Sequence, residues 1–479
     1  MKPLILLFVS TPLLAALPAV GPDYHRPTVA APDGFHDLPA ESAAWKAVAP
    51  AGMLPRGEWW RLFGDPVLDD LVARALAANQ DLQAAAARVA QARAEAGLAR
   101  SAYLPSMELG AGLDRGRASS TTDGATRAAV TETHFGTLNA SWEIDLFGRV
   151  RRLSESARAL AAASTDDFAN VQLVLTAEVA SGYFSLRALD RELAIVADGV
   201  ALRREALALV TSRRSGGIST DFDVARAETE LASTEAEAAA LALRRAALQN
   251  TLAVLTGESA PAFALAPDSA QPLGALPEIP VGLPSELLER RPDIAAAEAA
   301  LVAANARIGV AKAAFFPAIA LTGAAGYASA DIDQLFNSDS RTWAIGPRLY
   351  LPVFQGGRNR ANLERSHAIY EENVASFRQR VLVAFREVQD ALSATRFLAE
   401  QAAAQERALA AARRAGALAQ TRYDGGLVSY FEVIDAQRAV LLAERSAAQL
   451  SAQRLITHVA LIKALGGGWN APVQVADAR

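Results

Sequence analysis

The sequence predicts a mainly helical protein with a smaller β part, built from one long unit that is present twice. Residues 81–109 (DLQAAAARVAQARAEAGLARSAYLPSMEL) align without a gap with residues 293–321 (DIAAAEAALVAANARIGVAKAAFFPAIAL). Residues 215–231 (SGGISTDFDVARAETEL) likewise match residues 424–440 (DGGLVSYFEVIDAQRAV). Such self-similarity indicates a repeated structural unit, so the fold and any site are expected in two related copies.

Composition favours closely packed helices and excludes several classes of function. Hydrophobic residues make up 51% of the 479 residues but aromatic ones only 6%, and much of the difference is alanine, the best helix former. A net charge of −5 without a basic block argues against nucleic acid as a partner. The absence of cysteine excludes disulfides, a thiol nucleophile, thiolate metal sites and a lipid anchor on an N-terminal cysteine. The histidines show no metal-ligand spacing, and no motif predicts a cofactor or enzymatic activity.

Residues 1–19 are expected to form a secretory signal. Lys2 precedes an apolar run, and small residues permit cleavage after Ala19. A short buried N-terminal helix is the alternative. No later stretch offers the ~20 uninterrupted apolar residues that a membrane-spanning helix needs. Any crossing of a membrane is therefore expected to use strands.

The N-terminal segment, residues 20–66, is expected to be extended because it is rich in proline. The first helix begins in FGDPVLDDLVARALAANQ. Asp65 is a natural N-cap, and Pro66 suits the first helical position.

Two β-hairpins are predicted, over residues 105–146 and 317–352, with polar tips at 114–133 and 328–341. Strict alternation of apolar and polar residues indicates strands with two unlike faces. The apolar positions of the second strand of each hairpin are Leu138, Ala140, Trp142, Ile144 and Leu146, and Trp343, Ile345, Leu349 and Leu351.

Long helices are predicted in the two tracts without proline, Arg149–Arg213 and Arg358–Arg422. Each would be roughly 100 Å long if continuous. Glycine pairs end both tracts, and a further helical stretch follows each pair, over 220–257 and 429–466. Helices of this length must pack side by side as hairpins or coiled coils.

The predicted organisation therefore has a first repeat over 67–257 and a second over 285–466. A linker, 258–284, joins the repeats, and a tail, 467–479, follows them. Each repeat contains a helix, a strand hairpin, a long helix, a glycine turn and a returning helix.

The apolar faces of the strands have two possible environments. In soluble proteins such a face usually packs on a core. If it meets lipid instead, every strand edge must be paired and the sheet must close. Four strands are too few for a barrel, since the smallest bacterial barrels have eight. Three chains would supply twelve, which favours a trimer.

Seven motifs occur in order along the chain: VGPDYHRP (20–27), EWWRLFGDPVLDDLVARALAANQDLQAA (58–85), SWEIDLFGRVRR (141–152), SGGISTDFDVARAETEL (215–231), LLERRPDIAAAEAAL (287–301), PVFQGGRNRA (352–361) and RYDGGLVSYFEVIDAQRA (422–439). With them the chain resembles the TolC/OprM-type outer-membrane efflux channels, over nearly its whole length from about Gly21 to Gly468. The resemblance implies a trimer with a twelve-stranded β-barrel in the outer membrane, four strands per protomer. A long α-helical barrel would continue it through the periplasm, with the linker in an equatorial belt.

The resemblance also implies a gate at the periplasmic tip. Glu432 and Asp435 match paired acids that ring the closed entrance, and their spacing puts both on one helical face. Asp223, the counterpart of Glu432 in the first repeat, matches an acid linked to a tyrosine, here Tyr423. Val428 stands where TolC has an arginine that makes a further link. The alternative is that these acids simply form a solvated helix face.

The turn glycines are the positions at which the resemblance implies contact with a periplasmic adaptor protein; they are Gly216, Gly217, Gly425 and Gly426. The expected function is therefore that of a passive exit duct for drugs and other small molecules, in the outer membrane of a Gram-negative cell. The adaptor would bridge it to an inner-membrane pump, which we expect to be proton-driven. Type I protein secretion, metal efflux and a soluble periplasmic coiled-coil scaffold are the alternatives.

Overall fold

The computed structural model describes residues 19–29, 32, 34–36, 57–119, 121, 130–269, 276–277, 279 and 291–467. The expected signal up to residue 18, parts of the 258–284 linker and the tail from residue 468 lie outside the described residues. The chain divides into two compact units, and helices contribute to both. One unit comprises residues 1–28, 88–165 and 296–378, and the other comprises 29–87, 166–295 and 379–479.

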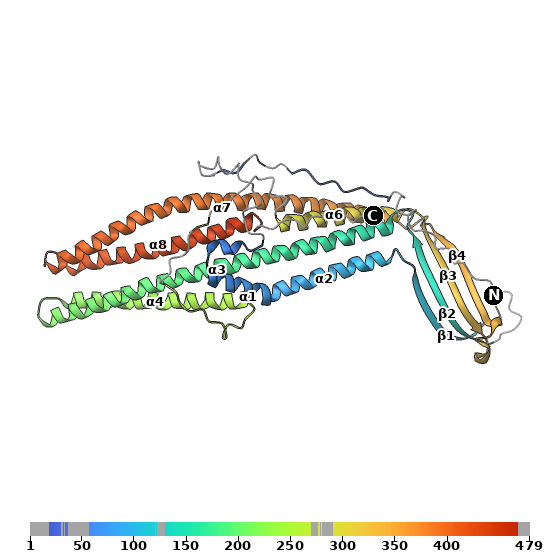
Figure 1. Ribbon diagram of the computed structural model, residues 1–479, viewed down its shortest axis with the longest axis horizontal. Helices are drawn as coiled ribbons and strands as arrows, with labels where there is room; N and C mark the ends of the chain where they lie inside the picture. The colour runs from blue at the N-terminus through green and yellow to red at the C-terminus, as the bar shows by residue number, and fades with distance from the viewer. Residues whose placement is uncertain are drawn as a thin grey trace. The chain divides into compact units, whose positions relative to one another are not determined.

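The first unit contains a four-stranded antiparallel sheet in the order β1-β2-β3-β4 (Figure 1). Two short 3-10 helices, η4 (Ile332–Gln334) and η5 (Ser338–Ser340), lie between the last two strands. The four strands are β1 (Ser106–Arg117), β2 (Val130–Ile144), β3 (Ala318–Ser329) and β4 (Arg341–Tyr350).

The register of this sheet separates an apolar face from a polar one. Leu138 of β2 pairs with Leu109 of β1 and with Ala325 of β3, which in turn pairs with Trp343 of β4. Because side chains alternate along a strand, these four residues form one apolar row across the sheet. Leu109 is 80% exposed and Trp343 is 78% exposed, so none of the described residues packs over the ends of this row.

The VGPDYHRP motif packs along the helices of the same unit. The Val20 amide donates a hydrogen bond to the Phe147 carbonyl at 3.0 Å, and Asn305 donates to the Pro22 carbonyl at 3.0 Å. Gly21 lies so close to Gly309 that a Cβ on Gly21 would stand 2.5 Å from the Gly309 Cα. The motif is therefore a structural strap at which only glycine permits the backbone contact.

Helices make up most of the rest of the described chain, and the longest two have 67 residues each. Both exceed the predicted tracts by two residues at their C-terminal ends. The helices are η3 (Trp59–Phe63), α1 (Pro66–Ala78), α2 (Gln80–Ser101), α3 (Arg149–Ser215), α4 (Asp221–Leu255), α6 (Pro292–Ala313), α7 (Arg358–Asp424) and α8 (Tyr430–Ala464).

The hydrophobic core of the second unit explains the EWWRLFGDP motif. Trp59, Trp60 and Phe63 of η3 are buried beside Phe184 of α3. As predicted, Asp65 caps α1: its carboxylate accepts hydrogen bonds from Val67 N at 2.9 Å and Leu68 N at 3.3 Å, with Pro66 at the start of the helix. The second carboxylate oxygen accepts a hydrogen bond from Tyr183 at 2.6 Å, which ties the cap to α3.

The single helix expected before the first strand is two helices in the structure. The chain leaves the helical conformation at Asn79, between α1 and α2. The Asn79 side chain accepts a hydrogen bond from Leu82 N at 2.9 Å and donates one to the Leu255 carbonyl at 3.0 Å. Asparagine favours helix caps because its side chain satisfies free backbone groups, which accounts for the break.

Among the described helices, α6 alone is long and apolar enough to cross a membrane by length and composition. Within the protein, 56% of its most apolar stretch is buried. That burial is typical of a core helix.

Candidate functional site at the helical tips

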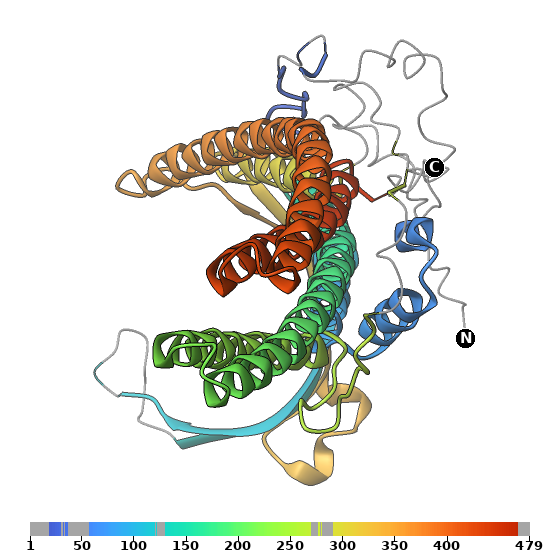
Figure 2. The same cartoon turned by 90° about the vertical axis from the view of Figure 1, so that its left-hand side faces the viewer.

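The two glycine turns share one backbone structure. In the first, Gly217 has φ +75°, and the amides of Gly217 and Ile218 donate to the carbonyls of Arg214 and Arg213. In the second, Gly426 has φ +70°, and the Gly426 and Leu427 amides bond to Tyr423 and Arg422. Both are Schellman motifs, which require the left-handed conformation at one residue. Figure 2 views the two hairpins, α3/α4 in green and α7/α8 in orange to red, from these tips.

The first tip holds Asp223 within its own helix end. Asp223 Oδ2 accepts hydrogen bonds from Thr220 N at 2.9 Å and Thr220 Oγ1 at 2.8 Å, and Asp223 N donates to Thr220 Oγ1 at 3.2 Å. This is a capping box, which satisfies free backbone groups at the start of α4. The hydrogen bonds from Thr220 lower the pKa of the Asp223 carboxyl.

The second tip has no capping box. Ser429 is the N-cap of α8 but makes no side-chain capping bond, so Glu432 takes no part in a capping box. Glu432 forms an exposed ion pair with Arg422 of α7 at 3.5 Å. Asp435 lies one turn further along and is also exposed. Both acids are thus exposed on α8, one turn apart.

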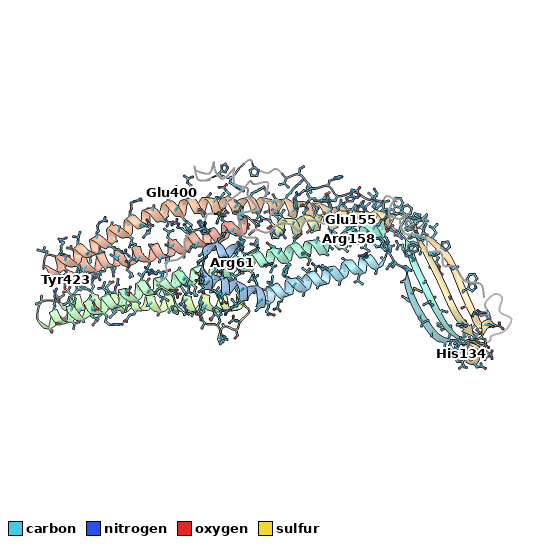
Figure 3. All side chains as sticks on the ribbon, in the orientation of Figure 1. Arg61, His134, Glu155, Arg158, Glu400 and Tyr423 are labelled. Carbon is cyan, nitrogen blue, oxygen red and sulfur yellow. The ribbon has the colours of Figure 1, made fainter. Side chains whose placement is uncertain are left out.

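Tyr423 is buried at the end of α7, where Figure 3 labels it. Arg213 of α3 lies over its ring, with the guanidinium carbon 4.6 Å from the ring centroid. The ring also packs on Tyr430 of α8 at 5.4 Å. The resemblance predicted a link from Tyr423 to Asp223. Among the described residues no hydrogen bond joins them, because the Asp223 carboxylate is bound by Thr220.

A ladder of charged residues between α4 and α8 was not predicted. Glu230, with a side chain only 7% exposed, accepts a 2.9 Å hydrogen bond from Arg438 Nε and lies 4.0 Å from Arg203 Nε. Two turns further from the tip, Arg445 pairs with Glu237 and, at 3.5 Å, with Glu192.

The ladder joins the two hairpins: its glutamates belong to the first repeat, and the arginines that pair with them from α8 belong to the second. The glutamates of α4 stand seven residues apart, as do the arginines of α8. This spacing is visible in the sequence, but it does not reveal which helices face each other. The hydrogen bond to Glu230 raises the pKa of Arg438, while burial lowers that of Arg203.

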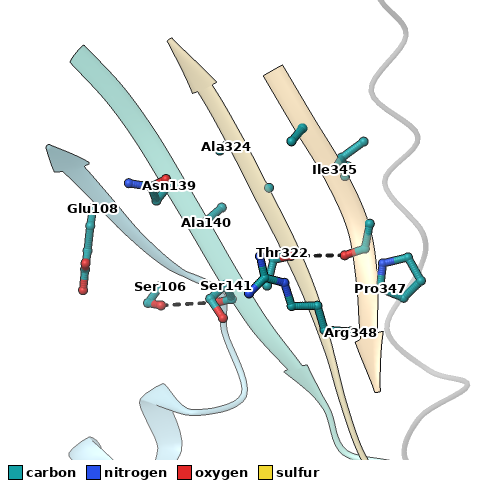
Figure 4. Close-up of a pocket in the computed structure, with 13 residues that line it drawn as sticks. Ser106, Glu108, Asn139, Ala140, Ser141, Thr322, Ala324, Ile345, Pro347 and Arg348 are labelled. Carbon is teal, nitrogen blue, oxygen red and sulfur yellow. Dashed lines mark hydrogen bonds between the residues drawn. The ribbon is translucent and has the colours of Figure 1, made fainter. Parts of the chain in front are cut away.

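The polar face of the sheet carries a hollow of about 490 Å³ (Figure 4). Ser106, Glu108, Asn139, Thr322 and Arg348 contribute polar side chains to it, one or two from each strand. Hydrogen bonds run across the strands from Ser106 to the Ser141 carbonyl and from Thr322 to the Gly346 carbonyl, both at 3.3 Å. This face is suited to water, whereas the opposite face is suited to lipid.

Paired long helical hairpins and a two-faced, four-stranded sheet in one chain define the protomer of an outer-membrane efflux channel. The solved structure of the outer-membrane channel OprN has the same fold, with a TM-score of 0.86 and 33% identity, over 95% of this chain and 100% of that one. The solved structure of CusC gives a TM-score of 0.82 at 30% identity, over 94% and 99% of the two chains.

Sequence comparison agrees. The chain is 36% identical over 452 residues to the toluene efflux pump outer membrane protein TtgF of Pseudomonas putida, with 94% of each chain covered. The model of the outer membrane efflux protein family matches residues 71–258 and 283–467. The chain belongs to this family. It is an outer-membrane protein of a Gram-negative cell and the channel component of an efflux system, as the sequence predicted.

Proposed function

We propose that three copies of the chain form a passive exit duct, with the sheets closed into one twelve-stranded barrel. The open sheet carries this proposal. Strands β1 and β4 each have one neighbour within the described chain, so two edges are free to pair. An unpaired edge in lipid is strongly unfavourable, and the apolar row from Leu109 to Trp343 is suited to lipid. Copies of the chain would supply the missing neighbours.

The helical tips are proposed as the meeting point with a periplasmic adaptor, which connects the duct to a proton-driven inner-membrane pump. Ile218 and Leu427 follow Gly217 and Gly426 at the same place in the two turns, and they are 79% and 75% exposed. Apolar side chains exposed at equivalent positions favour a protein partner. The relatives named as efflux pump components support the same assembly.

Small organic molecules are the proposed cargo, because the relatives include a toluene efflux pump protein of 36% identity. Cation export is the second candidate. It is favoured by 33% identity over 458 residues to the cation efflux system protein CusC of Escherichia coli O157:H7, with 94% of this chain and 96% of that protein covered. Deletion of the gene should sensitise cells to solvents and drugs under the first proposal, and to metal salts under the second.

The entrance of the duct is proposed to lie at the tips, with Glu432 and Asp435 facing the passage. Three chains would then bring six carboxylates to one constriction. Rings of acidic side chains select cations in other channels. Tyr423 and Asp223 are proposed to act at the same level, where they fix the ends of α7 and α4.

Single-channel recording of the purified protein in a planar bilayer tests the duct and the entrance separately. The protein should conduct, with a preference for cations. The double variant Glu432→Ala, Asp435→Ala should conduct more or lose that preference. The control is Glu235→Ala, because Glu235 is an exposed acid further from the tip on α4. An unchanged preference in the double variant would reject the entrance assignment, and a protein without any conductance would reject the duct.

Membrane extraction separates this proposal from a peripheral scaffold. A closed barrel should stay in the membrane fraction after a salt wash and require detergent, whereas a scaffold should wash off. Type I protein secretion predicts in addition that deletion abolishes export of a protein substrate.

A further inference from the structure

We propose that two arginine–aromatic contacts hold the two hairpins of one protomer together at their tips, and that these contacts keep the entrance narrow. This inference deepens the proposed gate and rests on it. The contacts are Arg213 with Tyr423 and Arg226 with Phe431. The Tyr423 ring, rather than its hydroxyl, is the functional part of that residue.

The geometry of both contacts is that of a cation over the face of an aromatic ring. The guanidinium carbon of Arg213 lies 4.6 Å from the Tyr423 ring centroid, and that of Arg226 lies 4.1 Å from the Phe431 centroid. Attraction is significant within about 6 Å. Both contacts cross between the hairpins, since the arginines belong to α3 and α4 and the rings to α7 and α8. Separation of the hairpins would break both contacts.

Burial makes the two contacts unequal. Tyr423 is only 7% exposed, and Tyr430 packs against it at 5.4 Å with the ring planes tilted by 51°. Phe431 is 51% exposed. Since water weakens cation–π attraction, the Arg213–Tyr423 contact should hold the tip more strongly.

Three acids at the tips, Asp221, Asp223 and Glu432, are bound within their own hairpins. Thr220 binds the Asp223 carboxylate through two hydrogen bonds in the same turn. Arg422 pairs with Glu432 inside the α7/α8 hairpin, and Arg214 pairs with Asp221 inside the α3/α4 hairpin at 2.6 Å. At the tips, the hairpins are therefore connected by the rings and guanidinium groups. Nearly two turns of α4 further from the tip, the charged ladder at Glu230 connects them again.

Paired substitutions at Tyr423 distinguish ring from hydroxyl. Y423L removes the ring and should raise the open-to-closed ratio in single-channel recordings by roughly threefold to thirtyfold. Y423F keeps the ring and should raise the ratio less than about twofold, because phenylalanine also binds cations through its face. In cells, Y423L should increase sensitivity to a large glycopeptide antibiotic more than Y423F does.

The arginine side of the contact gives a second test that does not alter the buried ring. R213Q should raise the open-to-closed ratio about as much as Y423L, and R226Q should raise it less. R214Q is the matched control, because Arg214 is the neighbouring arginine and pairs within its own hairpin. Thermal melting of the purified assembly identifies any variant that fails to fold, in which case R213Q decides the question.

Two results would overturn the inference. An equal increase of the open-to-closed ratio in Y423F and Y423L would show that the hydroxyl holds the tip. A wild-type open-to-closed ratio in both Y423L and R213Q would show that neither partner does. Either result leaves the duct intact, whereas a wild-type protein without conductance would reject the proposed function itself.

Discussion

At the scale of single residues, the most perturbed acid outside the tips is Asp166 of α3. It is half-buried, and its neighbour in sequence is Asp167. Burial, with a smaller contribution from the charge of Asp167, raises the pKa of Asp166 to about 6. When the pKa of an acid is higher in the folded state than in the unfolded state, ionisation of that acid destabilises the folded state.

This shift predicts a pH-dependent stability. The contribution of Asp166 to the free energy of unfolding should be fully present below pH 3.8, its ordinary pKa. It should be lost as the pH rises through about 6, the pKa in the folded state. Asp166→Asn should therefore stabilise the protein at pH 7.5, because it removes a destabilising charge. The gain should be roughly 1–2 kcal/mol, less than the full pKa shift would give, because the side chain is only half-buried. At pH 4.5 the gain should be much smaller. Thermal unfolding at the two pH values measures the difference, and equal gains at both would contradict the assignment.

The site was predictable residue by residue only where its interactions are local. The Schellman turns follow from Gly217 and Gly426, since each motif is closed within six residues. The capping box of Thr220 and Asp223 is equally local, although the resemblance assigned Asp223 to Tyr423 instead. The contact of Arg213 with Tyr423 joins residues more than two hundred positions apart, and no local pattern specifies it.

At the scale of elements, only one glycine of each turn is required by the backbone. Gly217 and Gly426 have positive φ, whereas a Cβ on Gly216 or Gly425 would make only ordinary van der Waals contacts, the nearest with carbonyl oxygens at 3.6 Å and 3.5 Å. The first position of each pair is therefore open to a side chain.

Alanine at the two positions of a turn should have unequal effects. Gly217→Ala should destabilise the α3/α4 hairpin by about 1–2 kcal/mol, because it forces a side chain into the left-handed region. Gly216→Ala should be nearly neutral or slightly stabilising, because alanine reduces the freedom of the unfolded chain. Hydrogen exchange at the tip reports both changes, and equal protection in the two variants would contradict this account.

The charged ladder is a second element whose members are unequal. Glu230→Gln should destabilise the protein by about 2–4 kcal/mol, because it leaves the buried Arg203 without its carboxylate. Glu235→Gln is the matched control on α4, since Glu235 pairs with Arg204 in an exposed position, and it should cost less than about 1 kcal/mol. Denaturant unfolding compares the two, and similar midpoints would reject the structural role of Glu230.

At the scale of the whole molecule, the alternation of the strands was the feature most completely predicted by sequence. Leu138 and Trp142 were assigned to one face, and the register confirms that they share it with Leu109 and Trp343. The break at Asn79 was missed although one of its causes is local, the cap that Asn79 makes with Leu82 N. The other, a hydrogen bond to the Leu255 carbonyl, depends on a helix far away in the sequence.

A chain without cysteine permits a direct test of the two faces. Leu138→Cys and Asn139→Cys place one thiol on adjacent residues of β2 with opposite orientations. In intact membranes, a water-soluble maleimide should label the Asn139→Cys variant on the polar face and leave the Leu138→Cys variant unlabelled. Both should react after denaturation. Labelling of Leu138→Cys alone would reverse the assignment of the faces.

The backbone-closed turns have an evolutionary consequence. Because each tip is shaped by main-chain hydrogen bonds and a single glycine, neighbouring side chains can change without altering its shape. After duplication the two tips could therefore diverge in chemistry while keeping the same type of turn, as Ile218 and Leu427, or Asp223 and Glu432, have done. A new partner can be accommodated by substitutions alone, on a scaffold that needs no remodelling.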